Sequence, residues 1–121
     1  MNKSIQIHEK DGIRVAQVIS GEILIRSIRD GLDLMGDLYF QGYDRIIIHE
    51  KNITPEFFDL KNGMAGEILQ KFSNYRMRLS IVGDFTKYPG KSIRDFIFES
   101  NKVGRITFTG SLQEALELLL K

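Results

Sequence analysis

Cysteine is absent from this sequence of 121 residues, and histidine occurs only twice, as His8 and His49. The lack of cysteine excludes disulfides, thiolate metal sites and cysteine nucleophiles together. Two histidines are also too few for a histidine-rich metal site. We therefore expect neither a metal nor a cofactor.

An excess of one charge is also missing. Lysine and arginine total 17 and aspartate and glutamate total 16, which gives a net charge of +1, and both signs are interspersed along the chain. A protein that binds nucleic acid usually carries a one-sided basic surface, so we expect no nucleic-acid partner. The apolar runs are far shorter than a membrane span, and the N-terminus turns polar early. We expect a cytoplasmic protein with no membrane partner.

The composition is that of an ordinary globular domain. Hydrophobic residues make up 42% of the chain and charged residues 27%, which is enough apolar material for one core. A second core would not fit comfortably in this length, and the sequence shows no repeat or linker. We expect a single domain over residues 1–121.

Short apolar segments predict five strands. Residues 4–9 and 13–19 alternate apolar with polar positions around Asp11-Gly12, a strong hairpin signal. Three consecutive isoleucines at 46–48 are typical of a strand buried on both faces, as in a parallel sheet. Residues 79–82 and the segment RITFTG predict the last two strands.

Apolar positions at helical spacing predict the intervening helices. The first stripe steps by three and four residues and consists of Ile25, Ile28, Leu32, Met35 and Tyr39, with Ser20 or Ser27 as the cap. A second helix is expected to begin at Pro55 and to be interrupted at residues 61–63, after which it resumes or a new helix starts, with Met64, Ile68 and Phe72 on one face. A third covers residues 91–101, with Asn101 as a left-handed cap, and a fourth follows Ser111, which forms a capping box with Glu114.

The order is therefore β-β-α-β-α-β-α-β-α, which predicts an α/β domain whose mostly parallel sheet is flanked by helices. We expect the four strands after the first to lie parallel and in sequential order.

Several motifs are specific: HE at 49–50, PEFFDL at 55–60, AGEILQKFSNYR at 65–76, VGDF at 82–85 and ESN at 99–101. With them, nearly the whole chain resembles a bacterial family known as domain of unknown function 4180. The resemblance implies no catalytic residues, since the family has no assigned activity.

The element order is also similar to that of the STAS domain, the fold of anti-sigma factor antagonists. That similarity implies a regulatory role, and in phospho-regulated STAS domains a serine at the start of the second helix is phosphorylated. Here the region reads EKNITPEFF, without the usual Asp-Ser-Ser-Gly-like signature. We expect Thr54 to cap the helix that begins at Pro55 rather than to accept phosphate.

The loops after parallel strands are where ligands gather in such sheets. Two of them carry candidate residues for a small-ligand or anion site: His49, Glu50, Asp84, Lys91 and Ser92. Gly90-Lys91-Ser92 precedes a helix as in a phosphate-binding loop, but the first glycine of that motif would fall on Phe85. The alternative for Ser92 is a helix cap. Adjacent strand residues point to opposite faces, which argues against a pair between His49 and Glu50.

Phe57 and Phe58 are about 100° apart on a helix and need not both face one core, and Phe98 lies off the inward stripe of its helix. For Phe57 or Phe58 taken singly, we favour an apolar face that closes over the sheet. Exposed aromatic surface, however, commonly marks a partner site. We therefore favour a non-enzymatic regulatory or protein-interaction domain. Its surface would include residues 54–60 and at least one of these rings, and its partner would be another protein or itself, in a homodimer. The alternative is a small-ligand or anion-binding domain, with weak hydrolase-like chemistry as a variant.

Overall fold

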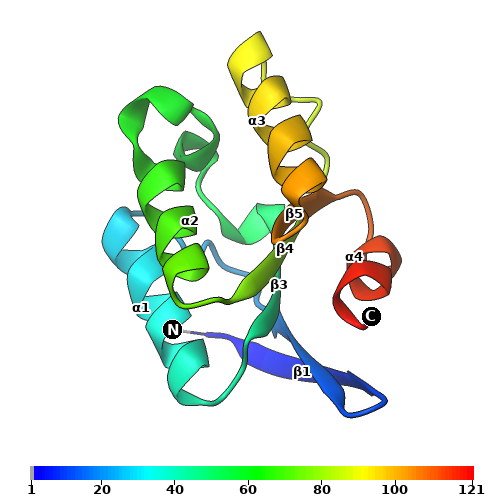
Figure 1. Cartoon of the computed structure of the whole chain (residues 1–121). Coiled ribbons are helices and arrows are strands. Elements are labelled where there is room, and N and C mark those ends of the chain that lie inside the picture. Colours follow the sequence, from blue (N-terminus) through cyan, green and yellow to red (C-terminus); the bar gives the residue numbers. More distant parts are fainter. Residues whose placement is uncertain (1) are drawn as a thin grey trace.

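Five strands form one mixed sheet in sequential order in the computed structural model, which describes residues 2–121 (Figure 1). The strands are β1 (Ser4–Lys10), β2 (Ile13–Ile19), β3 (Arg45–His49), β4 (Arg78–Val82) and β5 (Ile106–Thr109). β1 pairs antiparallel with β2, and the remaining neighbours pair in parallel. The predicted α/β class, strand order and strand directions are confirmed.

The hairpin between β1 and β2 turns at the predicted dipeptide. Asp11 has φ 53° and Gly12 has φ 82°, so both turn residues adopt the left-handed region that a tight two-residue hairpin requires. The sequence signal and the backbone geometry agree here because the turn is a local property.

Four helices cover the sheet: α1 (Ile28–Phe40), α2 (Met64–Asn74), α3 (Lys91–Val103) and α4 (Leu112–Leu119). The first three lie on one face and α4 lies alone on the other (Figure 1). Ile46 and Ile48 belong to the larger core beneath α1, α2 and α3, whereas Ile47 packs toward α4. The isoleucine run is therefore buried on both faces, as predicted. Over residues 2–121 the structure contains no helix with the length and apolar character of a membrane span.

Helix α1 begins later than its apolar stripe suggests. Ser27 is the cap, its hydroxyl accepting from the Asp30 amide at 3.1 Å. Ile25 precedes the helix and pairs with Ile53 in an isolated bridge, and Tyr39 is exposed. The buried side of α1 is instead built from Gly31, Leu34, Met35 and Leu38. The predicted apolar stripe and the buried side of α1 overlap at Met35, so apolar spacing alone does not tell which of the two faces the core.

The structure of residues 50–63 differs from the predicted second helix. The chain makes three short 3-10 turns, at Glu50–Asn52, Pro55–Phe58 and Leu60–Asn62, before α2 begins after Gly63. The Thr54 hydroxyl makes no capping hydrogen bond; the Thr54 amide instead donates to the Ile25 carbonyl at 2.8 Å. A helix does begin at Pro55, as a short 3-10 turn with Thr54 at the position before it, but the predicted capping bond of the Thr54 hydroxyl is wrong.

Candidate functional site

Glu50 lies directly after β3 and is almost fully buried. Its Oε2 accepts a hydrogen bond from the Tyr88 hydroxyl and pairs with the Lys87 Nζ at 2.9 Å. A buried carboxylate is costly without such partners. The two contacts hold the loop of residues 83–90 against the end of β3. We refer to Glu50, Lys87 and Tyr88 as the Glu50 clasp.

Gly83 makes the clasp possible. A Cβ at this position would lie 2.4 Å from the Glu50 Cβ and 3.0 Å from its Oε1. The glycine is therefore required by the close approach of β3 and β4 at their carboxyl ends, and its role is steric. This explains why a glycine follows the last residue of β4.

Aromatic rings pack around the clasp. Phe58 stacks on Tyr88 with ring centroids 4.3 Å apart, and also contacts Phe57 and Phe85. Burial first, and then the hydrogen bond to Glu50, raise the pKa of Tyr88 well above its ordinary value. Phe57 and Phe58 are only 1% and 4% exposed. Their assignment to an interaction surface is wrong, because the 3-10 turn directs both rings into the core beneath the loop of residues 83–90.

His49 points to the opposite face of the sheet from Glu50. Its Nε2 lies 2.9 Å from the Gln17 Nε2. Burial, and then the charge of Lys51, lower the pKa of His49. The two adjacent residues do not form an acid–base pair, as strand alternation predicted.

The other three predicted site residues also lie apart. Asp84 accepts hydrogen bonds from the hydroxyl and the amide of Thr86, which lower the pKa of Asp84. Lys91 pairs with Asp95 along α3 at 2.6 Å. Ser92 is not the helix cap: Gly90 occupies that position, and no side chain caps α3.

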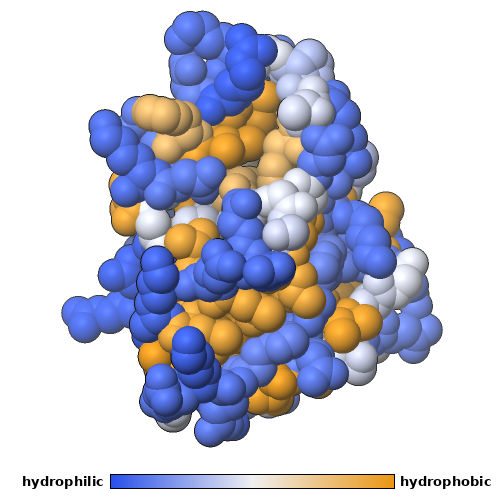
Figure 2. Space-filling model, turned by 90° about the vertical axis from the view of Figure 1, so that its right-hand side faces the viewer, coloured by the Kyte–Doolittle hydropathy of each residue, from blue (hydrophilic) through white to orange (hydrophobic). Residues whose placement is uncertain are grey.

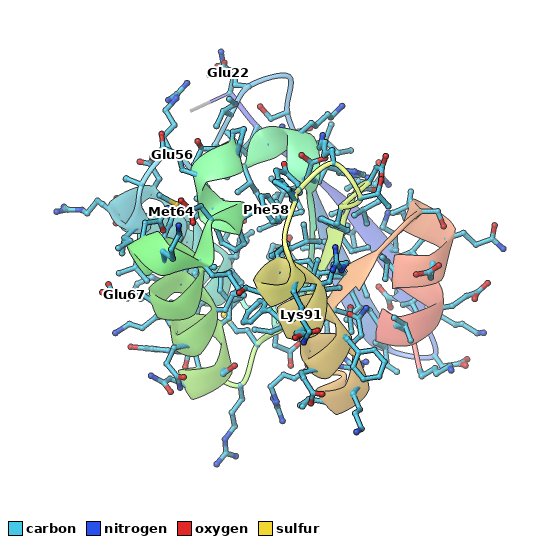
Figure 3. The ribbon with its side chains drawn as sticks, turned by 90° about the horizontal axis from the view of Figure 1, so that it is seen from above. Glu22, Glu56, Phe58, Met64, Glu67 and Lys91 are labelled. Carbon is cyan, nitrogen blue, oxygen red and sulfur yellow. The ribbon has the colours of Figure 1, made fainter. Side chains whose placement is uncertain are left out.

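A hollow of about 870 Å³ opens at the carboxyl ends of the strands. It is lined by Pro55, Phe58, Asp59, Leu60, Lys61, Tyr88, Pro89, Gly90, Ser92 and Ile93. Figure 3 shows Phe58 and the beginning of α3, where Lys91 lies, around this region, while Glu67 points outward from α2. Of the five residues predicted to form a ligand site, only Ser92 lines the hollow. Among the described residues no group of three or more histidine or acidic side chains is placed to hold a metal ion.

A second hollow, of about 360 Å³, lies between α2 and α3. We call it the α2–α3 groove, and it is lined by Gly66, Leu69, Gln70, Ser73, Phe96, Glu99, Ser100, Val103, Arg105 and Ile106. Carbon atoms dominate its surface, with Glu99 and Arg105 as the charged residues. Such a concave apolar surface with a polar rim is typical of an interaction site.

Three large apolar side chains between residues 2 and 121 are more than half exposed. Phe98 is 65%, Val103 79% and Phe40 90% exposed. Sequence reasoning found Phe98 but missed the other two, because a valine and a phenylalanine at the ends of helical segments look like core residues. Tyr39 and Tyr75 pack edge to face near the end of α1, with ring centroids 5.1 Å apart.

The side of the molecule that carries α4 mixes hydrophobic and hydrophilic surface (Figure 2). A hollow of about 640 Å³ lies there between Lys10 and the outer residues of α4, which include Leu112, Leu116 and Leu120. A single short helix thus covers this face only in part.

Comparison with known families finds a match over nearly the whole chain. A family model described as "Domain of unknown function (DUF4180)" matches residues 10–119. No match was found among curated proteins.

Proposed function

We propose a function from the geometry of a chain that belongs to the DUF4180 family: a non-enzymatic protein-interaction domain that pairs with a second copy of itself through the α2–α3 groove. The observation that carries the proposal is an apolar groove next to an exposed apolar residue. The family description assigns no activity, so the proposal depends on the chain's own residues.

One face of α2 and one face of α3 form the two walls of the groove. On α2 its walls are Gly66, Leu69, Gln70 and Ser73, and on α3 they are Phe96, Glu99, Ser100 and Val103. Both sets follow the three- and four-residue spacing of one helix face. A Cβ added to Gly66 would meet no atom within 4 Å, so another chain can approach α2 closely there.

Val103 lies at the end of α3 and is 79% exposed although it borders an apolar groove. A second copy would bury it. Closed two-fold dimers are the commonest way in which a surface of this kind is covered. Val103 lines the groove, whereas the exposed Tyr39, Phe40 and Phe98 of α1 and α3 do not.

The groove carries one acidic and one basic residue, so two copies of it can pair opposite charges across a two-fold axis. Glu99 lies on α3, Arg105 follows the end of that helix, and both line the groove. A two-fold axis that passes between them would set Glu99 of each copy against the partner's Arg105, twice. Lys102, near the axis, is exposed and can turn its ammonium group to water. Paired opposite charges favour this register over others.

Sedimentation equilibrium tests the proposal. The wild type should form dimers in the micromolar range, and Val103→Asp should weaken the dimer by about tenfold or more. Glu99→Arg alone should also weaken it, whereas Glu99→Arg combined with Arg105→Glu should restore it. A monomeric wild type, or a double variant that stays dissociated, would contradict the proposal.

Phe98→Glu serves as the matched control. Phe98 lies five positions before Val103, which places it about 140° around the helix, on the outer side of α3. This variant should remain dimeric. If it alone dissociates, the contact is the patch around Phe98 that the sequence predicts, and the groove is not the interface.

The hollow at the strand ends supports a second candidate, the binding of a small apolar ligand. Its walls combine the Phe58 and Tyr88 rings with Asp59, Lys61 and Ser92, the mixture of apolar and polar groups common in ligand pockets. Indole is a suitable probe. Backbone NMR shifts confined to the residues of this hollow would support the candidate, and their absence at high indole concentration would remove it.

A further inference from the structure

A chain of polar side chains crosses the sheet face that α4 leaves partly open. The His8 Nε2 lies 2.8 Å from the Gln17 Oε1, and the Gln17 Nε2 lies 2.9 Å from the His49 Nε2. Gln17 is only 7% exposed. We call these three residues the histidine chain.

The strand register produces this arrangement. Gln17 lies opposite Gln6 on β1 and beside Ile47 on β3, so His8 and His49 are its diagonal neighbours two residues further along those strands. Alternation places all three side chains on the same face. The amide of Gln17 therefore bridges the edge strand and the end of β3.

The amide has one side that accepts and one side that donates. In the observed orientation, its oxygen accepts from the His8 Nε2–H and its NH₂ group donates to the lone pair of the His49 Nε2. A proton can be added to His8 at Nδ1 without disturbing either bond. A proton at the His49 Nε2 removes the lone pair and breaks the second bond, unless the amide turns over.

If the Gln17 amide flips, exchanging the positions of its oxygen and its NH₂ group, the histidine that must stay neutral is His8 instead of His49. The amide oxygen then faces His49, and the NH₂ group faces the His8 Nε2, which must be an unprotonated acceptor. Two imidazolium rings present two donors to Gln17, which has only one acceptor to offer. Both hydrogen bonds survive only while at least one ring is neutral.

The neighbouring charges do not relieve this conflict. Burial, and then the charge of Lys51 in the following turn, lower the pKa of His49. The charged residues that share the face on β1, β3 and β4 are the basic Lys10, Arg45 and Arg78. The α4 residues packed on this face are leucine and alanine. Glu117 of α4 borders the hollow that Lys10 also lines.

We infer that, while both hydrogen bonds of the histidine chain are intact, the Gln17 amide allows only one of His8 and His49 to be protonated. Acidification that protonates both rings therefore breaks one of these bonds and opens the side-chain link between β1 and β3. This is a pH-sensitive device built into the sheet. It is independent of the proposed dimer, because the α2–α3 groove belongs to the opposite face.

A double-mutant cycle read by NMR titration of the His49 ring tests the coupling. His8→Phe frees the amide to turn its oxygen to His49, which should raise the pKa of His49 by about half to one pH unit, the shift expected when one hydrogen bond changes from favouring the neutral form to favouring the charged form. In a Gln17→Met background, the same His8→Phe change should have no effect. Repulsion between the rings through space would instead give the same rise in both backgrounds, and that result would overturn the inference.

Gln17→Glu provides the complementary variant. A carboxylate accepts from both rings, so it should raise the pKa of His49 further than Gln17→Met does, by about one to three pH units. Gln6→Met is the matched control, since Gln6 occupies the same face of β1 without joining the chain. Circular dichroism establishes that each variant is folded. Equal titration of His49 in the Gln17→Glu and Gln17→Met variants would also contradict the inference.

Discussion

The two faces of the sheet are built differently. The face toward α1, α2 and α3 is an apolar layer that includes Ile46 and Ile48. The face toward α4 has a small apolar cluster around Ile47 and carries buried polar side chains, namely Gln17, Ser80, Thr107 and Thr109. A face sealed by three helices can be entirely apolar, whereas a face covered by one short helix keeps polar groups. Ser80 and Thr109 bond to each other at 3.0 Å, while the buried Thr107 hydroxyl has no partner in the part of the chain that the structure describes.

Truncation of neighbouring isoleucines should show this difference most strongly. Ile47 and Ile48 are the same residue on the same strand, and each is at most 1% exposed. Alanine at either position should cost about 2–5 kcal/mol of the free energy of unfolding. Ile48→Ala should cost more, because three helices packed against one another cannot settle into the cavity as readily as α4 alone.

Urea denaturation of both variants measures the two costs. A larger loss for Ile47→Ala would reverse the comparison and show that α4 is as rigidly held as the helices of the other face.

A substitution at Gly83 should have the next largest effect. Gly83→Ala places a methyl group 2.4 Å from the Glu50 Cβ, an anchored atom that cannot rotate away. We expect a loss of about 1–3 kcal/mol. Gly36→Ala is the control: its site in α1 is open and helical, so it should stabilise by about 0.5–1 kcal/mol.

Thermal unfolding followed by circular dichroism compares the two glycine variants. If Gly83→Ala proves neutral, the ends of β3 and β4 can separate, and the Glu50 clasp is not held as tightly as its contacts imply.

The pH dependence of stability should show the smallest effect, and it concerns the polar face. The pKa of His49 in the folded protein is lower than its ordinary value of 6.5. The unfolded chain therefore binds more protons just below that pH, and the stability from neutral His49 is complete above pH 6.5 and is lost as the pH falls toward the folded pKa.

Urea midpoints measured from pH 8 downward should fall below about pH 6.5 in the wild type. A His49→Phe variant should lose less stability over the same window. Parallel curves for the two proteins would show that His49 does not contribute.

The sequence predicts some local features correctly and others only in part. The Asp11-Gly12 turn, the Ser111 cap, whose hydroxyl accepts from the Glu114 amide at 3.1 Å, and the isoleucine strand are as expected. Asn101 is not a left-handed cap. It lies inside α3, its side chain donates to the Phe108 carbonyl and accepts from the Phe108 amide, and Gly104 ends the helix with φ 84°.

The candidate sites were harder to foresee than the fold. The α2–α3 groove depends on how far two helices diverge, and the histidine chain depends on a register that brings residues 8, 17 and 49 together. Neither is encoded in a short stretch of sequence. An α-helix over PEFFDL would separate Phe57 and Phe58 by about 100°, which predicts that both need not face the core. A 3-10 turn followed by an aromatic loop instead buries both.

The sequence by itself determined the order of the elements, the sheet topology and the burial of β3 on both faces. These follow from periodicity, turn chemistry and the handedness of crossovers, which act over a few residues at a time. Only the tertiary structure decided where Glu50, His49 and Val103 point and what each contacts. The contacts of Glu50 with Tyr88 and of His49 with Gln17 join residues more than thirty positions apart, and burial and geometry at that range arise from the packing of the whole chain.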